Sequence, residues 1–226
     1  MKRSRIPQPL ARTAVLLAVV ALTACGSQPP TPGWQLNAKG SIDRAAQAWL
    51  SGDSRVEAVE FARARAEVAS TGRADLVARI EMLRCATRVA ALVFELCSGF
   101  EALAADATPA EQAYARYLAG RAQAEDAALL PPVHRSLAIG TVSPEAALAA
   151  LTDPLSRLVA AGVLMQRGQA SPAVVEQAVQ AASSQGWRRP LLTWLRVQQA
   201  RALAGGAAEE AARIQRRIDL VAPVGN

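Results

Sequence analysis

The second half of the chain carries the same helix-start signal several times. A Ser, Thr or Asp is followed directly by proline, giving Pro109, Pro144, Pro154 and Pro172. A small polar side chain caps the first free amides of a helix, and proline suits the first helical position because the amide it lacks has no partner there. Glycines in the position of helix C-terminal caps follow apolar-periodic runs at Gly52, Gly72, Gly168, Gly186 and Gly205. These signals predict a chain of many short helices.

Composition supports an all-α fold. Alanine, which has the best intrinsic helix propensity, occupies 51 of the 226 positions, and no stretch shows the alternation typical of strands. The motifs Ser54-x-x-Glu57 and Thr108-x-x-Glu111 also fit capping boxes. We therefore expect helices over 42–50, 55–70, 74–91, 98–105, 109–128, 132–139, 144–151, 154–167, 172–185, 190–204 and 207–221.

The later helix starts repeat at a nearly constant interval. Pro154 and Pro190 are 36 residues apart, and Pro172 and Ala207 are 35 apart, as in stacked antiparallel hairpins. Two segments, 48–62 and 186–204, resemble the turn region of tetratricopeptide (TPR) repeats. This resemblance implies a TPR-like solenoid over residues 41–222. The middle, 92–152, is irregular, so an irregular helical bundle is the alternative.

The first 24 residues have the order of a secretion signal. Four basic residues, Lys2, Arg3, Arg5 and Arg12, precede the apolar run Ala14–Ala24. This run has 11 residues, whereas a membrane-spanning helix needs about 20. We interpret residues 1–24 as a signal peptide that is removed, not as a permanent anchor.

The end of this run resembles a lipobox. Leu22-Thr23-Ala24-Cys25 is similar to the motif at which bacterial lipoproteins are cut before the cysteine, whose sulfur receives a diacylglyceryl group. The chain as a whole is similar to lipoproteins of Gram-negative bacteria. The resemblance implies lipidation of Cys25 and attachment to a membrane. Gly26, where an Asp would favour inner-membrane retention, favours the outer membrane, with the body facing the periplasm.

A proline-rich segment follows the cysteine. Residues 26–40 contain three prolines and one charged side chain, which predicts a flexible tether from the lipidated Cys25 to the helical body. Fully stretched, these residues would span about 50 Å.

The charge of the body argues against nucleic acid as a partner. The whole chain has a formal net charge of +6, of which the leader contributes four charges, leaving +2 on the remaining 202 residues. The high overall charge is therefore no evidence for nucleic-acid binding, and we expect no nucleic-acid partner. The C-terminal span is locally basic through Arg188, Arg189, Arg196, Arg201, Arg213, Arg216 and Arg217.

Two further cysteines predict a disulfide. Cys85 and Cys97 are 12 residues apart, so on one straight helix they would lie about 18 Å from each other. A disulfide needs Cα atoms about 4.4–6.8 Å apart. The bond therefore requires the helix to end between them, and the bulky stretch Leu92-Val93-Phe94 is a suitable place. Two buried, unbonded thiols are the alternative.

No set of residues typical of catalysis emerges. The single histidine, His134, lacks a nucleophile or an orienting acid at a telling spacing, and we interpret it as a surface or hydrogen-bonded residue. The available His and Cys residues do not supply a usual metal site, and no motif indicates a cofactor. Acid pairs, which glycan-cleaving enzymes need, were sought among Glu101, Asp106, Glu125 and Asp126, and we expect these side chains to be solvated.

These observations favour a non-enzymatic binding or scaffold protein. We expect a lipid-anchored helical body that binds an envelope protein. A peptidoglycan-acting enzyme or activator is one alternative. A structural lipoprotein whose basic C-terminal face contacts membrane or glycan is another.

The lipobox gives the first testable prediction. A Cys25→Ser precursor should fold but lose lipidation and membrane retention, because a single serine hydroxyl cannot take the thioether-linked lipid that holds the protein. Fractionation of cells labelled with radioactive palmitate measures both properties. Unchanged membrane fractionation of the variant would contradict the lipobox interpretation.

Overall fold

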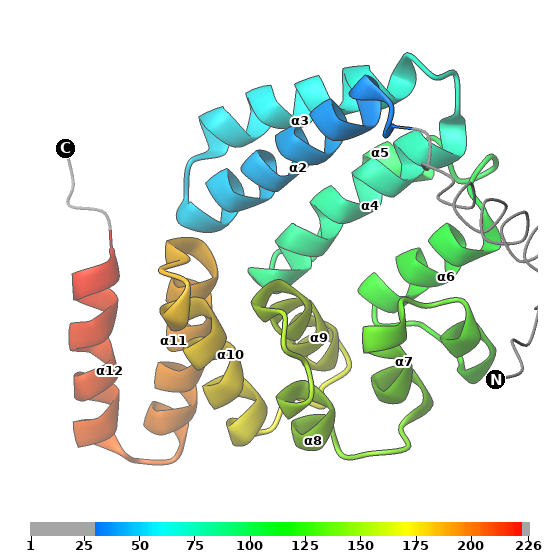
Figure 1. Ribbon diagram of the computed structural model, residues 1–226. Coiled ribbons are helices and arrows are strands. Elements are labelled where there is room, and N and C mark those ends of the chain that lie inside the picture. Colours follow the sequence, from blue (N-terminus) through cyan, green and yellow to red (C-terminus); the bar gives the residue numbers. More distant parts are fainter. Residues whose placement is uncertain (1–29, 223–226) are drawn as a thin grey trace, which may run out of the picture. The chain divides into compact units, whose positions relative to one another are not determined.

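The computed structural model describes residues 30–222, and all regular structure within them is helical. The signal peptide and Cys25 lie outside the described residues. Helices α2 (Gly33–Ser51) and α3 (Ser54–Ala69) form an antiparallel hairpin, and α4 (Ala74–Ala90) packs against both (Figure 1). An all-α fold was predicted, and it is confirmed.

The middle of the chain consists of short elements. These are α5 (Ser98–Glu101), α6 (Pro109–Leu118), the 3₁₀ helix η1 (Ala124–Ala128), α7 (Pro132–Ile139) and α8 (Pro144–Ala149). They are followed by four longer helices, which pack one after another: α9 (Pro154–Gln166), α10 (Pro172–Ser184), α11 (Arg188–Ala204) and α12 (Ala208–Val221) (Figure 1).

The predicted hairpin repeat is present in this last part. The starts of α9 and α11 are 34 residues apart, and those of α10 and α12 are 36 apart. In a solenoid, however, each repeat contacts only its neighbours in sequence. Here α4 packs against α9, and α2 packs against α11. The hairpins are thus assembled into a bundle by contacts between distant parts of the sequence.

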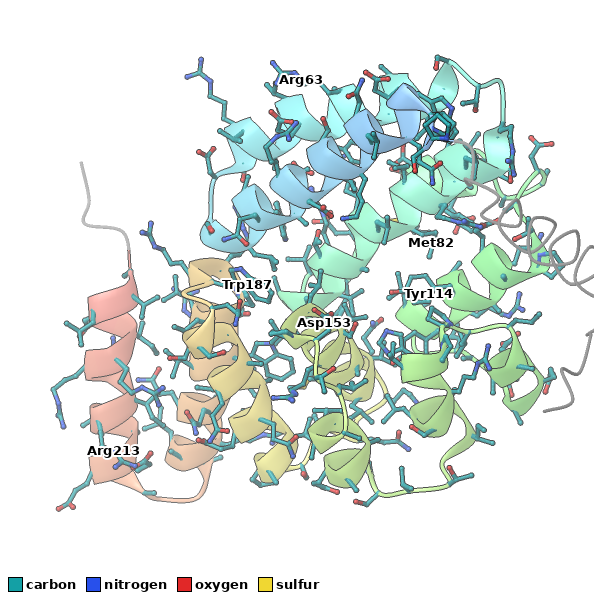
Figure 2. All side chains as sticks on the ribbon, in the orientation of Figure 1. Arg63, Met82, Tyr114, Asp153, Trp187 and Arg213 are labelled. Atoms are coloured by element: carbon teal, nitrogen blue, oxygen red, sulfur yellow. A yellow bond between two sulfur atoms is a disulfide. The ribbon has the colours of Figure 1, made fainter. Side chains whose placement is uncertain are left out.

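Most of the buried apolar side chains form one core. It extends from α4 through α6 and α9 to α10 and α11, and it includes Tyr117, Leu158 and Trp194, which are almost completely buried. A smaller cluster, centred on Phe61, lies between α2, α3 and α4. Two buried tryptophans connect helices: Trp194 Nε1 donates to the carbonyl of Ala90, and Trp187 Nε1 donates to Gln47 Oε1 (Trp187 is labelled in Figure 2).

The N-terminal boundary of the body differs from the prediction. Residues 33–40, which we expected to belong to a tether, are the first turns of α2. Ala38 is buried in the smaller core, Trp34 packs against that core, and Asn37 donates to Glu67 on α3. The prediction of a tether here was wrong because glycine and asparagine in this segment suggested a loop, whereas packing against α3 stabilises a helix.

The end of one helix and the cap of another also differ from the prediction. The helix expected over 109–128 ends at Leu118, because Gly120 takes a left-handed conformation (φ 70°) and turns the chain before η1. The cap of α3 is Asp53, whose side chain accepts from the amide of Val56, so Ser54 and Glu57 do not form the expected capping box. The box at Thr108 and Glu111 is confirmed.

The close packing of α9 on α4 predicts the effect of a small substitution. Alanine usually stabilises a helix interior over glycine by about 1 kcal/mol. At Gly162, however, an added Cβ would collide with the carbonyl oxygen of Val89 and come within 2.8 Å of its Cγ1. We expect Gly162→Ala to destabilise the protein by about 1–3 kcal/mol in urea unfolding, because the two backbones must separate.

Gly33→Ala is the matched control, since nothing lies within 4 Å of a Cβ at that helical position. It should leave the unfolding midpoint unchanged or raise it slightly. A neutral Gly162→Ala would show that α4 and α9 are not packed this closely.

Candidate functional site

An open cavity of about 620 Å³ lies beside the C-terminal half of α4. One wall is the α4 face that carries Glu81, Arg84, Cys85 and Arg88, and the other comes from α6 and the end of α9. Figure 2 labels Met82 on α4 and Tyr114 on α6, the two helices that border this space. Residues 93–97, α5 and Arg121 complete the lining. We call it the disulfide-bordered cavity.

The cavity owes its name to the bond between Cys85 and Cys97. The Cα atoms of these residues are 5.9 Å apart, and the chain between them leaves α4 at Ala90 and turns at Leu92, which has a positive φ of 58°. A bulky residue in this conformation is uncommon. The helix thus ends just before the stretch Leu92-Val93-Phe94 where a break was predicted, and the chain turns at its first residue.

Most charged groups at the cavity wall are already paired. Arg84 Nε and Arg88 Nη2 donate to the buried Oε1 of Glu57, at 2.8 and 2.9 Å. Glu81 accepts from Arg65 at 2.9 Å. In each case the carboxylate is almost fully buried and is paired with a guanidinium. Pairing is needed because burying an unpaired charge costs several kcal/mol.

Three exposed charges in the lining have no ion pair among residues 30–222. They are Glu95, Glu101 and Arg121. Two exposed apolar side chains stand next to them: Phe94 is 45% exposed and Leu96 is 81% exposed. The cavity therefore offers charges of both signs and an apolar rim.

The acids considered for catalysis do not gather in this cavity. Of the four, only Glu101 lines it, and Asp106 and Glu125 are exposed elsewhere. Asp126 was expected to be solvated, and that expectation was wrong: its side chain is buried against Arg116, whose Nε donates at 3.0 Å. Hydrogen bonds from Arg116 and from the amide of Gln123 lower the pKa of Asp126 to about 2, so this carboxyl stays ionised.

His134 lies in the interior of the protein and contacts aromatic side chains. It is buried, its Nδ1 lies 3.1 Å from the hydroxyl of Tyr117, and its ring lies 6.1 Å from that of Tyr114. Of the two alternatives predicted for His134, a surface or a hydrogen-bonded residue, the hydrogen-bonded one is correct. Within the described part of the chain, no three His, Cys, Asp or Glu side chains are placed to hold a metal ion.

Three of the seven C-terminal arginines make polar contacts within the protein. Arg189 is drawn inward: its guanidinium lies 3.8 Å from the ring centre of Trp49, and it donates to the Trp49 carbonyl and to Ser54. Arg201 bonds the carbonyl of Ala170, and Arg213, on α12, pairs with Glu210 (Figure 2). Four of the seven arginines remain exposed without an ion pair in the described residues: Arg188, Arg196, Arg216 and Arg217.

Comparison with known proteins adds no identification. No protein-family model, curated protein sequence or solved structure matches the chain. Within residues 30–222, no helix combines the length and apolarity needed to cross a membrane.

The cysteines of the cavity could be predicted from the sequence, but its open part could not. Leu96 and Arg121 were not predicted to belong to a site, because single apolar or basic residues are common on surfaces. One signal was present: Phe94 and Leu96 flank Glu95 in an apolar–acidic–apolar pattern just before a predicted disulfide.

The burial of His134 generates a pH-dependence prediction. Burial lowers its pKa from 6.5 to about 4, while Asp153 weakly opposes the shift. Between pH 6.5 and 4 the unfolded chain thus binds one proton more than the folded chain, and stability falls as the pH falls. Urea unfolding at pH 5 should show a free energy about 2 kcal/mol lower than at pH 7.5.

His134→Gln removes this ionisation and is expected to flatten the difference between the two pH values. An equal loss of stability in the variant would show that another group is responsible.

Proposed function

We propose that this protein is a lipid-anchored lipoprotein of the cell envelope whose helical body binds another envelope protein at the disulfide-bordered cavity. The observation that carries the binding part is the open cavity itself. Its volume of about 620 Å³ lies within the range of about 300–1,000 Å³ that is common for ligand sites. The lipobox-like sequence at Cys25 supports the anchored location.

The side chains at the rim of the cavity are suited to binding a partner and not to catalysing a reaction. Exposed Phe94 and Leu96 offer apolar area that a partner would remove from water, and Glu95, Glu101 and Arg121 offer charges for orientation. The buried carboxylates around it are held by arginines, which keeps the walls rigid. A rigid wall with a mixed rim is suited to selective binding, because little ordering entropy is lost on association.

Site-specific photocrosslinking in intact cells tests the proposal. A benzophenone amino acid at position 96 should give a discrete adduct with one envelope protein. The same group at position 59 is the matched control, since Val59 is also exposed (49%) but lies on α3, away from the cavity lining.

The adduct should disappear when Cys25→Ser is combined with the crosslinker at position 96, because the body would no longer be held at the membrane. The captured protein, once identified and tagged, should recover this chain in the reverse experiment. Identical adducts from positions 96 and 59, or no adduct from folded, membrane-bound protein, would refute the proposal.

A further inference from the structure

Three arginines meet where the N-terminal helices contact α11 (Figure 1). Arg84 and Arg88 come from α4, and Arg189 comes from the first turn of α11. Arg84 Nε and Arg88 Nη2 donate to the same carboxylate oxygen, Oε1 of Glu57. The guanidinium carbons of Arg88 and Arg189 each lie 3.8 Å from the ring centre of Trp49, so they are at most twice that distance apart. We call these three residues the arginine cluster.

The arginine cluster holds more positive than negative charge. Among residues 30–222, Glu57 is the one carboxylate that forms an ion pair with any of its three members. Asp53 precedes Ser54, to which Arg189 donates, but the Asp53 carboxylate caps α3 and forms no ion pair in the described chain. Three guanidinium charges against one paired carboxylate leave an excess of two positive charges.

Part of this excess charge is poorly screened by water. The side chain of Arg88 is only 16% exposed, because it lies against the ring of Trp49 and the carboxylate of Glu57. Burial lowers the pKa of Arg88, the charge of Glu57 opposes that shift, and the charges of Arg84 and Arg189 add to it. Like charges repel more strongly where water is excluded. The contact between α11 and the N-terminal helices therefore includes a repulsion between guanidinium groups.

Each member of the arginine cluster also keeps a free hydrogen-bond donor. Arg84 Nη1, Arg88 Nε and Arg189 Nη1 have no acceptor among residues 30–222. All three nitrogens are accessible to solvent, since none is among the buried polar atoms that lack a partner. Guanidinium groups form short, charge-assisted hydrogen bonds with the oxygens of anions. The free donors and the excess charge thus favour an anion with several oxygen acceptors.

We propose that the arginine cluster binds a phosphate group, supplied either by free phosphate or by the headgroup of an anionic lipid. A phosphate monoester carries about −1.5 to −2 charge at pH 7 and offers three acceptor oxygens, which matches the excess of two positive charges. Because Arg189 lies on α11 and the other two arginines lie on α4, the bound anion would bridge these helices and strengthen their contact. Arg84 and Arg88 also line the disulfide-bordered cavity, but this site needs no partner protein.

Chemical protection tests the site in the unaltered full chain, purified in a non-ionic detergent. Phenylglyoxal modifies accessible arginines, and a bound anion slows the reaction at the guanidinium groups that it contacts. Inorganic phosphate should slow modification of Arg84 and Arg189 several-fold relative to chloride at equal ionic strength, as mapped by mass spectrometry. Arg196 is the internal control, because it is exposed on the same helix as Arg189 and should react equally in both salts.

Thermal unfolding of two variants tests the predicted stabilisation. A ligand that binds only the folded state raises the unfolding midpoint saturably. Inorganic phosphate should do so for the unaltered chain and for Arg196→Gln, which loses a charge outside the arginine cluster, but much less for Arg189→Gln. Phosphate also stabilises proteins in general because it is excluded from their surfaces, so the measured quantity is the difference between the two variants.

Glycerophosphoglycerol, the water-soluble headgroup of phosphatidylglycerol, distinguishes the two sources of phosphate. Protection by inorganic phosphate alone identifies a free anion, and stronger protection by the headgroup identifies a lipid. Equal modification of Arg189 in chloride and in both phosphate solutions would overturn the anion site, as would an equal rise of the midpoint in both variants. If Arg189→Gln fails to fold, the protection experiment decides. None of these outcomes bears on the proposed function, because no partner protein takes part.

Discussion

The pairing of buried carboxylates with arginines determines how the helices of this protein meet. Glu57 on α3 binds Arg84 and Arg88 on α4, Glu81 on α4 binds Arg65 on α3, and Glu111 on α6 binds Arg79 on α4. Each carboxylate is buried, so loss of its arginine partners would leave an uncompensated charge in the interior, at a cost of several kcal/mol. Helix α4 takes part in all of these ion pairs, so it is the element around which α3 and α6 are placed.

A tryptophan between two arginines extends this network to the C-terminal helices. The guanidinium carbons of Arg88 and Arg189 each lie 3.8 Å from the ring centre of Trp49. Burial lowers the pKa of Arg88, and the neighbouring carboxylate of Glu57 opposes that shift. Together with the bond from Trp187 to Gln47, these contacts hold α11 against α2. They bring together residues about 140 positions apart, and they turn a row of hairpins into a bundle.

The sequence predicted the helices well and the packing poorly, for physical reasons. Caps and prolines act within a few residues, so Pro109, Pro154 and Pro172 marked true helix starts. The start of α2 at Gly33 could not be inferred, because packing on α3 and not local propensity stabilises those turns. The disulfide could be anticipated from spacing, but the cavity could not, since Arg121 and Gln166 join its wall only through tertiary contacts.

The early start of α2 sets how far the body can travel from its proposed anchor. Only eight peptide units separate Cys25 from Gly33, which reach about 28 Å even when fully extended. With the proposed lipid anchor on Cys25, the body would search for partners in a thin layer over the membrane. Its encounters then resemble two-dimensional diffusion, in which a partner confined to the same layer is met at a high effective concentration. A weak individual contact would suffice for stable association, provided that both proteins occupy that layer.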